Sequence, residues 1–291
     1  GDRLDWYQKA VRDEHPRVRL EAVRCLAREG TVQAAATAHQ VLDAPMDRFL
    51  DFALWRTARD LQTAWLPALQ KGEKTFDDSA HLIFALKAVE SPDIVPPLLA
   101  LLTKSEDRAA QGEMVGIVAS LANAEQLGLV LTWLDTIPAE ERASHLARLR
   151  VATVQYQRTP TAAQHGLVVK WLQAGNIGLA AAAAEAAGAW KVTAAEATLA
   201  KWLADEATPA RQRTAAIRGL ADLGSKSALD VVAKIARESS DPASKQVALE
   251  SLAAQRPNLA AQLLIASVDT DFPGDATVRT LLARRDGAQL V

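Results

Sequence analysis

Apolar residues recur along the chain in blocks, and within each block they are three or four positions apart. Leu50, Leu54, Thr57, Leu61 and Trp65 follow this spacing. Such a spacing predicts helices that turn one stripe of side chains toward a neighbour. Because proline lacks a backbone N–H and crowds the preceding turn, Pro67 predicts that the stretch 46–71 is broken rather than one long helix.

The blocks themselves repeat. The segment 13–30 returns at 208–224, where Ala22, Leu26 and Gly30 align with Ala216, Leu220 and Gly224, and Arg19 aligns with Arg213. A third copy at 241–252 continues the pattern after about 32 residues, with Ala248 and Leu252 in the apolar positions. A fixed period of this length is the signature of a helical repeat architecture.

A second recurring element ends in Trp-Leu or a similar pair, at 131–134, 169–172, 200–203 and 233–236. Each repeat is therefore predicted to hold two helices, here called A and B. The B helices are expected near 15–29, 46–62, 77–89, 106–122, 139–156, 177–189, 208–223, 241–255 and 274–285. These form about nine repeats, and we expect residues 1–291 to be a single domain.

Proline and glycine mark the expected helix ends. Proline follows a capping residue in Ser91-Pro92, Thr159-Pro160, Thr208-Pro209 and Asp241-Pro242, where the first turn of a helix tolerates it. Glycine follows predicted helix ends at Gly30, Gly72, Gly175 and Gly224, where a left-handed cap needs no Cβ.

Asp13, Pro16, Val18, Arg19, Ala22 and Leu26 match, position by position, the B helix of the HEAT repeat. The chain resembles that family by spacing over its whole length and by motif in about four repeats. The resemblance implies an all-α fold, a right-handed α-solenoid of about nine HEAT-like two-helix repeats. It also implies a non-enzymatic scaffold whose concave B-helix face binds a protein partner or positions neighbouring domains.

A narrower resemblance rests on 43–54 and 65–69. These segments look like the HEAT segment of large planctomycete-type bacterial proteins, which combine a membrane-associated sugar-dehydrogenase-like β-propeller, helical repeats and a haem c domain. It implies that the chain is a middle domain excised from a longer protein, with a periplasmic or membrane-associated location.

Composition and charge exclude several classes of protein. Hydrophobic residues make up 49% and aromatic residues only 5%, and many of the apolar residues are Ala and Leu, which favours helix over sheet. The net charge of -2 disfavours a protein that coats nucleic acid. Cys25 is the only cysteine, so this segment holds no internal disulfide, Cys-rich zinc site or CxxCH haem attachment. No apolar stretch reaches the roughly 18 residues that span a bilayer.

Two sets of residues attract a functional interpretation. Trp133, Trp171 and Trp202 recur at one position of the A helix, which favours packing between repeats over a ligand-stacking surface. The second set is basic and is read either as a stripe that binds phosphate or carboxylate, or as a ladder that pairs with acidic residues at helix starts such as Asp13, Asp241 and Asp275. We favour the ladder; its members, which are candidate ladder or concave-face residues, are Arg19, Arg213, Lys245 and Arg279.

Other reactive side chains do not form a known motif. The five histidines lack HxxH and HExxH spacing, so no metal site is predicted, and His81 is expected to lie beside the core in a hydrogen-bonded structural role. Adjacent carboxylates at 77–78 and 140–141 diverge by about 100° on a helix and suit its N-terminus. Cys25 is expected to be a small buried hydrophobe. The run 180–184 predicts either a close approach of a neighbouring backbone or a shallow depression on the concave face.

The resulting expectation is a scaffold with no catalytic residue, cofactor or metal. The alternative, a HEAT-type binder of nucleic acid or a tetrapyrrole ligand, is similar to HEAT-type DNA glycosylases and bilin lyases. The near-neutral charge and the lack of a basic helix face interleaved with aromatic residues speak against it. A search for motifs does not exclude an active site dispersed over several repeats.

Overall fold

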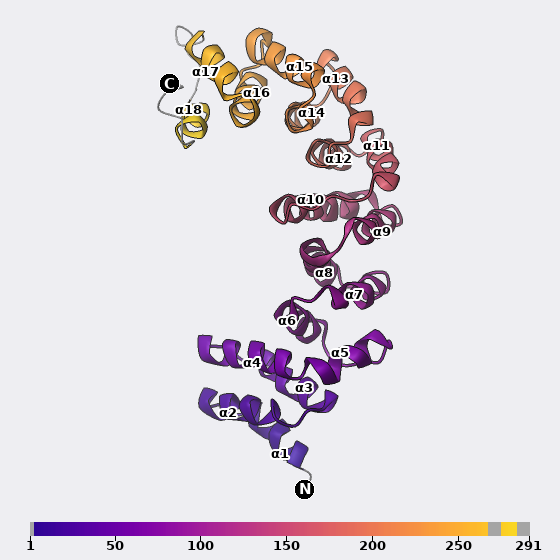
Figure 1. Cartoon of the computed structure of the whole chain (residues 1–291), viewed down its shortest axis with the longest axis vertical. Coiled ribbons are helices and arrows are strands. Elements are labelled where there is room, and N and C mark those ends of the chain that lie inside the picture. The colour runs from indigo at the N-terminus through magenta and orange to yellow at the C-terminus, as the bar shows by residue number, and fades with distance from the viewer. Residues whose placement is uncertain (1–2, 267–274, 284–291) are drawn as a thin grey trace. The chain divides into compact units, whose positions relative to one another are not determined.

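The helical repeat expected from the spacing is present. The computed structural model describes residues 3–266 and 275–283, and within them it holds α-helices and short 3-10 turns but no β-strand (Figure 1). The all-α repeat fold is therefore confirmed. The chain divides into two compact units, Gly1–Gln126 and Leu127–Val291, and each is described by itself. None of the described helices is long and apolar enough to span a membrane.

Helices alternate between the A and B types along the chain. The A helices are α1 (Arg3–Ala10), α3 (Val32–His39), α5 (Gln62–Gln70), α7 (Val95–Leu102), α9 (Ala124–Leu134), α11 (His165–Leu172), α13 (Glu196–Ala204), α15 (Lys226–Glu238) and α17 (Pro257–Ala266). The B helices are α2 (Pro16–Leu26), α4 (Arg48–Asp60), α6 (Ser79–Val89), α8 (Arg108–Leu121), α10 (Ala139–Gln155), α12 (Ile177–Ala189), α14 (Ala210–Leu223), α16 (Pro242–Gln255) and α18 (Asp275–Leu282). Every B helix predicted from the spacing is found. Short 3-10 turns precede or follow some of the A helices: η1 (Gln40–Asp43), η2 (Pro92–Ile94), η3 (Ala162–Gln164) and η4 (Thr193–Ala195).

The helix ends follow the expected cap chemistry in part. Pro92 and Pro242 begin helices after their caps as predicted, whereas Pro209 is itself the N-cap of α14 and Pro160 precedes Thr161, the N-cap of η3. Gly30, Gly72 and Gly224 have φ of 66°, 80° and 75°, as left-handed caps require. Gly175 was predicted to do the same, but it has no positive φ, because it immediately precedes Asn176, the N-cap of the next helix. The stretch 46–71 is broken as predicted, but the break lies at Leu61, and Pro67 sits inside α5.

Within each unit, each helix pair buries its apolar stripe against the next pair. In unit 1, α2, α4, α6 and α8 pack in succession, and in unit 2, α10, α12, α14, α16 and α18 do so. Trp171 is buried, and its Nε1 donates to Asp135 Oδ1 of the preceding repeat at 2.9 Å. Trp133 is also buried, whereas Trp202 is partly exposed. Cys25 was predicted to be buried but is partly exposed, because it lies at the edge of the α2 stripe.

The helices α12 and α14 approach each other closely. A Cβ built on Gly188 would lie 2.4 Å from the carbonyl oxygen of Gly219, and one on Gly219 would lie 2.5 Å from the carbonyl oxygen of Ala184. Neither distance is compatible with a real side chain. The two glycines and the alanine run of α12 therefore let the backbones touch, as expected for residues 180–184.

The fourth residue of several B helices fixes the loop that joins helix A to helix B. Arg19 donates to the carbonyl oxygens of Asp13 and Glu14 at 2.8 and 3.1 Å, and also to Pro45 at 2.7 Å. Arg213 donates to the carbonyls of Glu206 and Thr208. Helical side chains point back toward the N-terminus of their helix, so the guanidinium reaches this loop.

Two residues missed by the motif comparison occupy the same position. Arg142 donates to the carbonyl oxygens of Leu134, Asp135 and Ile137 at 2.7 to 2.9 Å. Gln111 donates to the carbonyl of Ser105 at 2.7 Å. The main partners are thus loop carbonyls rather than acidic side chains at helix starts, although Arg142 also pairs with Asp135 Oδ1 at 3.4 Å. A carbonyl is present at this place in any sequence, so the contact does not need a partner residue.

Replacing Gly219 by Ala tests the contact between α12 and α14. We expect the variant to lose about 1–3 kcal/mol of unfolding free energy, because the added Cβ overlaps backbone and forces the helices apart. Urea unfolding followed by circular dichroism measures this. Gly166→Ala in α11 is the matched control in the same unit, since a Cβ there meets no atom within 4 Å. Equal stability of the two variants would contradict the close packing.

Replacing Arg142 by Ala tests the loop contact. Three hydrogen bonds from a charged donor are lost and their carbonyls stay partly buried, so we expect a loss of roughly 3 kcal/mol in urea unfolding. Lys245→Ala removes a residue at the same position of α16 whose ammonium makes no hydrogen bond or ion pair with the described residues. That control should change stability by less than about 0.5 kcal/mol. A comparable loss of unfolding free energy in both variants would show that the hydrogen bonds to the loop carbonyls do not contribute specifically to stability.

Candidate functional site

A hollow lies on the B-helix face of unit 2. It measures about 960 Å³ and opens to solvent. Its walls and floor come from α10, α12 and α14, which lie side by side (Figure 1). The lining residues are Glu140, Ala143, Ser144, Ala147, Gly175, Asn176, Ile177, Gly178, Ala181, Ala182, Glu185, Ala210, Arg211, Thr214, Ala215 and Arg218.

The floor is formed by α12 and is almost free of side chains. Gly178, Ala181, Ala182 and Glu185 are spaced i, i+3, i+4 and i+7, so they share one face of the helix. Ala180, Ala183 and Ala184 belong to the opposite, buried face. The two readings of the alanine run therefore both hold, because one face packs tightly and the other leaves a depression.

The walls repeat the same spacing on the two flanking helices. Glu140, Ala143, Ser144 and Ala147 face the hollow from α10. Arg211, Thr214, Ala215 and Arg218 face it from α14. Three parallel helix faces thus present small side chains in the middle and charged side chains toward the ends.

A cluster of charges closes one end of the hollow. Glu185 accepts from Arg150 at 3.0 Å and from Arg218 at 3.5 Å, so one carboxylate serves two guanidiniums. The Nε of Arg150 is buried and has no hydrogen-bond partner. Because the arginines carry more donors than the shared carboxylate accepts, the cluster keeps hydrogen-bonding capacity for a further acceptor.

The cluster separates this hollow from a smaller one of about 330 Å³, lined by Arg150, Glu185, Arg218, Asp222, Ser251 and Ala254. Burial raises the pKa of Asp222 above its ordinary value, and the Lys191 ammonium opposes that shift. The side chain of Gln255 donates to the Asp222 carboxylate at 3.4 Å. The smaller hollow extends the same helix face from α14 to α16.

The opposite end of the hollow carries an unpaired cation. A Cβ on Gly178 would lie 3.5 Å from an Arg211 guanidinium nitrogen, so the absence of a side chain leaves room for that group. Arg211 is exposed and forms no ion pair with the described residues. Glu140 stands on the α10 wall and is also exposed. The two walls therefore differ in charge, with arginines on α14 and an acid on α10.

None of the four basic residues singled out from the sequence lines this hollow. Arg19 is buried and held by loop carbonyls, and Arg213 is half-buried and held in the same way. Lys245 is partly exposed, and Arg279 lies exposed at the fifth rather than the fourth residue of its helix. The side chain of Asp275 lies outside the described residues. A role of these four residues in contacting a partner stays a prediction.

Sequence reasoning missed Glu185, Arg211 and Arg218. A usable signal was present, because Arg211 and Arg218 are seven residues apart and bracket Thr214 and Ala215 on one helix face. Their significance depends on the small residues of α12, which belong to the preceding repeat. Only the stacking of the two helices brings these features together.

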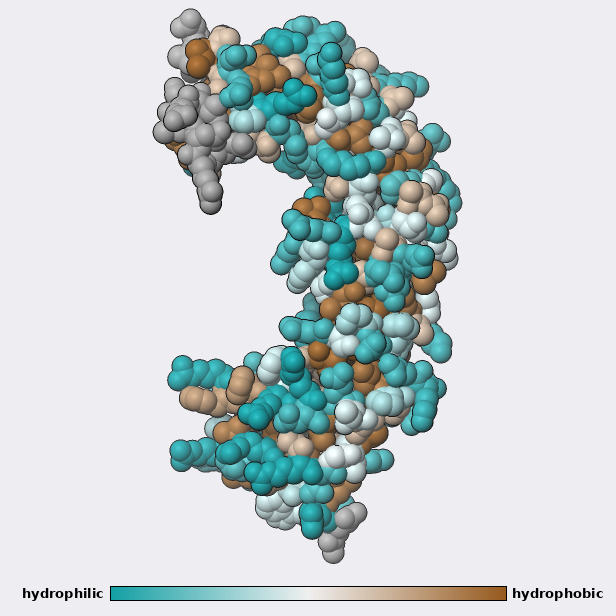
Figure 2. Space-filling view, in the orientation of Figure 1, coloured by the Kyte–Doolittle hydropathy of each residue, from teal (hydrophilic) through white to brown (hydrophobic). Residues whose placement is uncertain are grey.

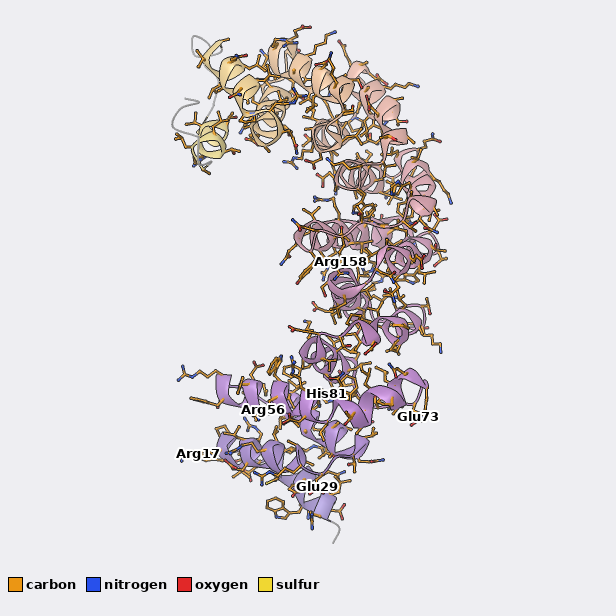
Figure 3. All side chains as sticks on the ribbon, in the orientation of Figure 1. Arg17, Glu29, Arg56, Glu73, His81 and Arg158 are labelled. Atoms are coloured by element: carbon orange, nitrogen blue, oxygen red, sulfur yellow. The ribbon has the colours of Figure 1, made fainter. Side chains whose placement is uncertain are left out.

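The histidines have structural environments. His81 is buried, and its Nε2 bonds Asp43 Oδ1 at 2.9 Å, as expected for a hydrogen-bonded position beside the core (Figure 3). His39 Nδ1 donates to the Ala35 carbonyl at 2.8 Å, and burial lowers the pKa of His39 to about 4. Among the described residues, no three His, Cys, Asp or Glu side chains gather in a way that would hold a metal ion.

A comparison with protein families agrees with this repeat structure. A family model described as HEAT repeats matches residues 167–253, which run from within α11 to within α16 and include the α12 floor and α14 wall of the hollow. A crystal structure of an engineered protein is similar at 16% sequence identity and a TM-score of 0.38, covering 100% of this chain and 98% of that one. A search among curated proteins finds no similar sequence.

The resemblance to the planctomycete-type multidomain proteins stays a prediction. The broader resemblance has direct support, since the matched segment contains the paired helices and the buried apolar positions described above. Residues 167–253 of the chain thus match the HEAT-repeat family, and the helices outside this segment follow the same two-helix pattern.

Proposed function

We propose that this chain is a non-enzymatic scaffold and that the hollow over α12 binds a segment of a partner protein. The observation that carries the proposal is the lining of the hollow, where the floor and both walls present residues at positions i, i+3, i+4 and i+7, small in the middle and charged toward the ends. A helix that presents its own residues at that spacing fits a groove of this kind. HEAT-type repeats create extended surfaces of stacked helices that suit protein partners.

The size and lining favour a polypeptide. At about 960 Å³ the hollow is at the upper limit of the roughly 300–1,000 Å³ typical of small-molecule pockets, and it is open rather than enclosed. Its acidic residue at the closed end, Glu185, is already paired with two guanidiniums. This pairing makes it a fixed acceptor rather than a free base, which supports binding over catalysis.

The charges on the walls define the orientation of the partner segment. Arg211 and Arg218 are seven residues apart on α14, which places them about 10 Å apart along the helix. A partner helix that carries acidic residues seven positions apart on its α14 side matches them. A basic residue on its other side matches Glu140.

Filling the hollow tests the proposal. A photo-crosslinking residue at position 182 identifies the partner, and the binding of the purified partner segment is then measured by calorimetry. Ala182→Trp should weaken this binding at least about tenfold, which is about 1.4 kcal/mol, because the indole occupies the floor.

Ala197→Trp is the matched control, since Ala197 lies exposed on α13 and outside the hollow. It should bind the partner like the unchanged protein. Unaltered binding by the Ala182→Trp variant would contradict the assignment of the hollow.

A further inference from the structure

The B helix α4 in unit 1 exposes aromatic side chains that its core does not need. Leu50, Leu54, Thr57 and Ala58 are buried and supply the packing of this helix. Phe49 and Phe52, by contrast, are 60% and 62% exposed. In Figure 2 the N-terminal end of α4, at the lower left, shows hydrophobic surface beside hydrophilic side chains. Single exposed apolar residues are common, but here several lie together on one helix.

These aromatic rings are ordered by each other and by arginines. The Phe52 and Trp55 rings stack with centroids 6.0 Å apart and planes 18° apart. The Arg59 guanidinium lies 4.7 Å above the Trp55 ring and also donates to the Ala88 carbonyl at the end of α6, at 3.2 Å. Because the stack is held in place before any partner arrives, little side-chain entropy is lost on binding.

The stack lies among arginines that mostly lack a carboxylate partner in the described part of the chain, with the exposed Asp51 as an acid on the same helix face. Arg48 lies 4.7 Å above the Phe49 ring and forms no ion pair with the described residues. The exposed guanidinium of Arg17, in the first turn of the adjacent α2, forms none either. Arg56 pairs only with Asp60, at 3.6 Å and with 71% of its side chain exposed (Figure 3). Clusters of aromatic residues and arginine are typical of the energetically dominant part of protein interfaces.

We infer that the solvent face of α4, together with the first turn of α2, binds a short acidic protein segment that carries an aromatic anchor. Its carboxylates would pair with Arg17 and Arg48, and its ring would stack on Phe52 and Trp55. This surface belongs to unit 1, so the inference does not rest on the hollow of unit 2. It defines a second docking surface with a different chemistry.

The charge of the whole unit distinguishes a peptide from a nucleic acid. Residues 1–126 contain more Asp and Glu than Lys and Arg. A long polyanion would meet this excess of negative charge. A short peptide senses mainly the charges within the screening length of about 8 Å. On α4, Asp47 is engaged in the helix cap and Asp60 pairs with Arg56. This leaves the exposed Asp51 against Arg48 and the nearby Arg17, neither of which forms an ion pair with the described residues.

The sequence analysis found no basic helix face interleaved with aromatic residues, and in the structure the aromatic face of α4 carries Asp51 as well as arginines. Arg48, Phe52, Trp55 and Arg59 are spaced by three and four residues, which places them on one face opposite Leu54. In the linear sequence they are separated by acidic and apolar residues, and the buried stripe dominates the pattern.

Selection from a random dodecapeptide phage library tests the inference. The library is panned on the full chain after removal of peptides that bind a Phe52→Ser variant. Enriched sequences should carry Asp or Glu next to an aromatic residue. A synthetic peptide of the enriched sequence should bind with an affinity that falls as salt rises, since charged contacts are screened.

Variants of exposed residues locate the binding. Phe52→Ser and Arg48→Glu should each weaken the synthetic peptide at least tenfold, with the far-UV spectrum and urea midpoint unchanged. Leu129→Ser, which changes a residue that is 57% exposed on α9, is the control and should bind normally. No enrichment, enrichment of neutral or basic peptides, or binding that neither variant weakens would overturn the inference.

The binding of a fluorescent single-stranded oligothymidylate of twenty nucleotides tests the alternative that this face binds nucleic acid. We expect no measurable anisotropy change at physiological salt. Binding that is tighter than that of the peptide and is lost in both variants would assign the face to nucleic acid and overturn the proposal.

Discussion

A single pair of helices of this size cannot bury all of its apolar side chains by itself, and the structure depends on that constraint. Within each unit, successive B helices pack against one another and cover each other's stripes. Stability is therefore a property of contacts between neighbours. Side chains on the solvent face of a B helix do not contribute to this packing, and both candidate binding surfaces occur on such faces.

The two surfaces use that freedom in opposite ways. On α12 the solvent face has almost no side chains, and the taller residues of α10 and α14 turn the gap into a hollow. On α4 the solvent face carries large rings that arginines hold in fixed positions. One helix thus contributes a recess and the other a projection, although both obey the same core pattern.

Much of the fold was predictable because its determinants are local. The spacing of apolar residues and the repeats of Ala, Leu and Gly located every B helix, since a helix can be recognised from the residues it contains. The stretch 46–71 is broken as predicted from Pro67, but the proline is not the cause. The chain turns at Leu61, and Pro67 is accommodated inside α5. The cap assigned to Gly175 failed because the neighbouring Asn176 already begins the next helix.

The candidate sites were less predictable because each depends on more than one repeat. The hollow needs the small residues of α12 and the arginines of α14, which no single motif contains. The basic ladder was recognised at Arg19 and Arg213, but the partners expected were carboxylates, whereas the long guanidiniums reach main-chain carbonyls. Arg142 escaped notice because its repeat departs from the family motif elsewhere.

The contacts of Arg142 and Arg213 with their own loops have an evolutionary consequence. Such a repeat holds its own loop by hydrogen bonds to main-chain atoms. It therefore needs no side chain from an adjacent repeat for this contact. Duplicating or deleting such a repeat leaves the hydrogen bonds of the other repeats intact. The sequence of the loop can change as long as the arginine is retained. Arrays assembled from such modules can change in length while their outer faces acquire new specificities.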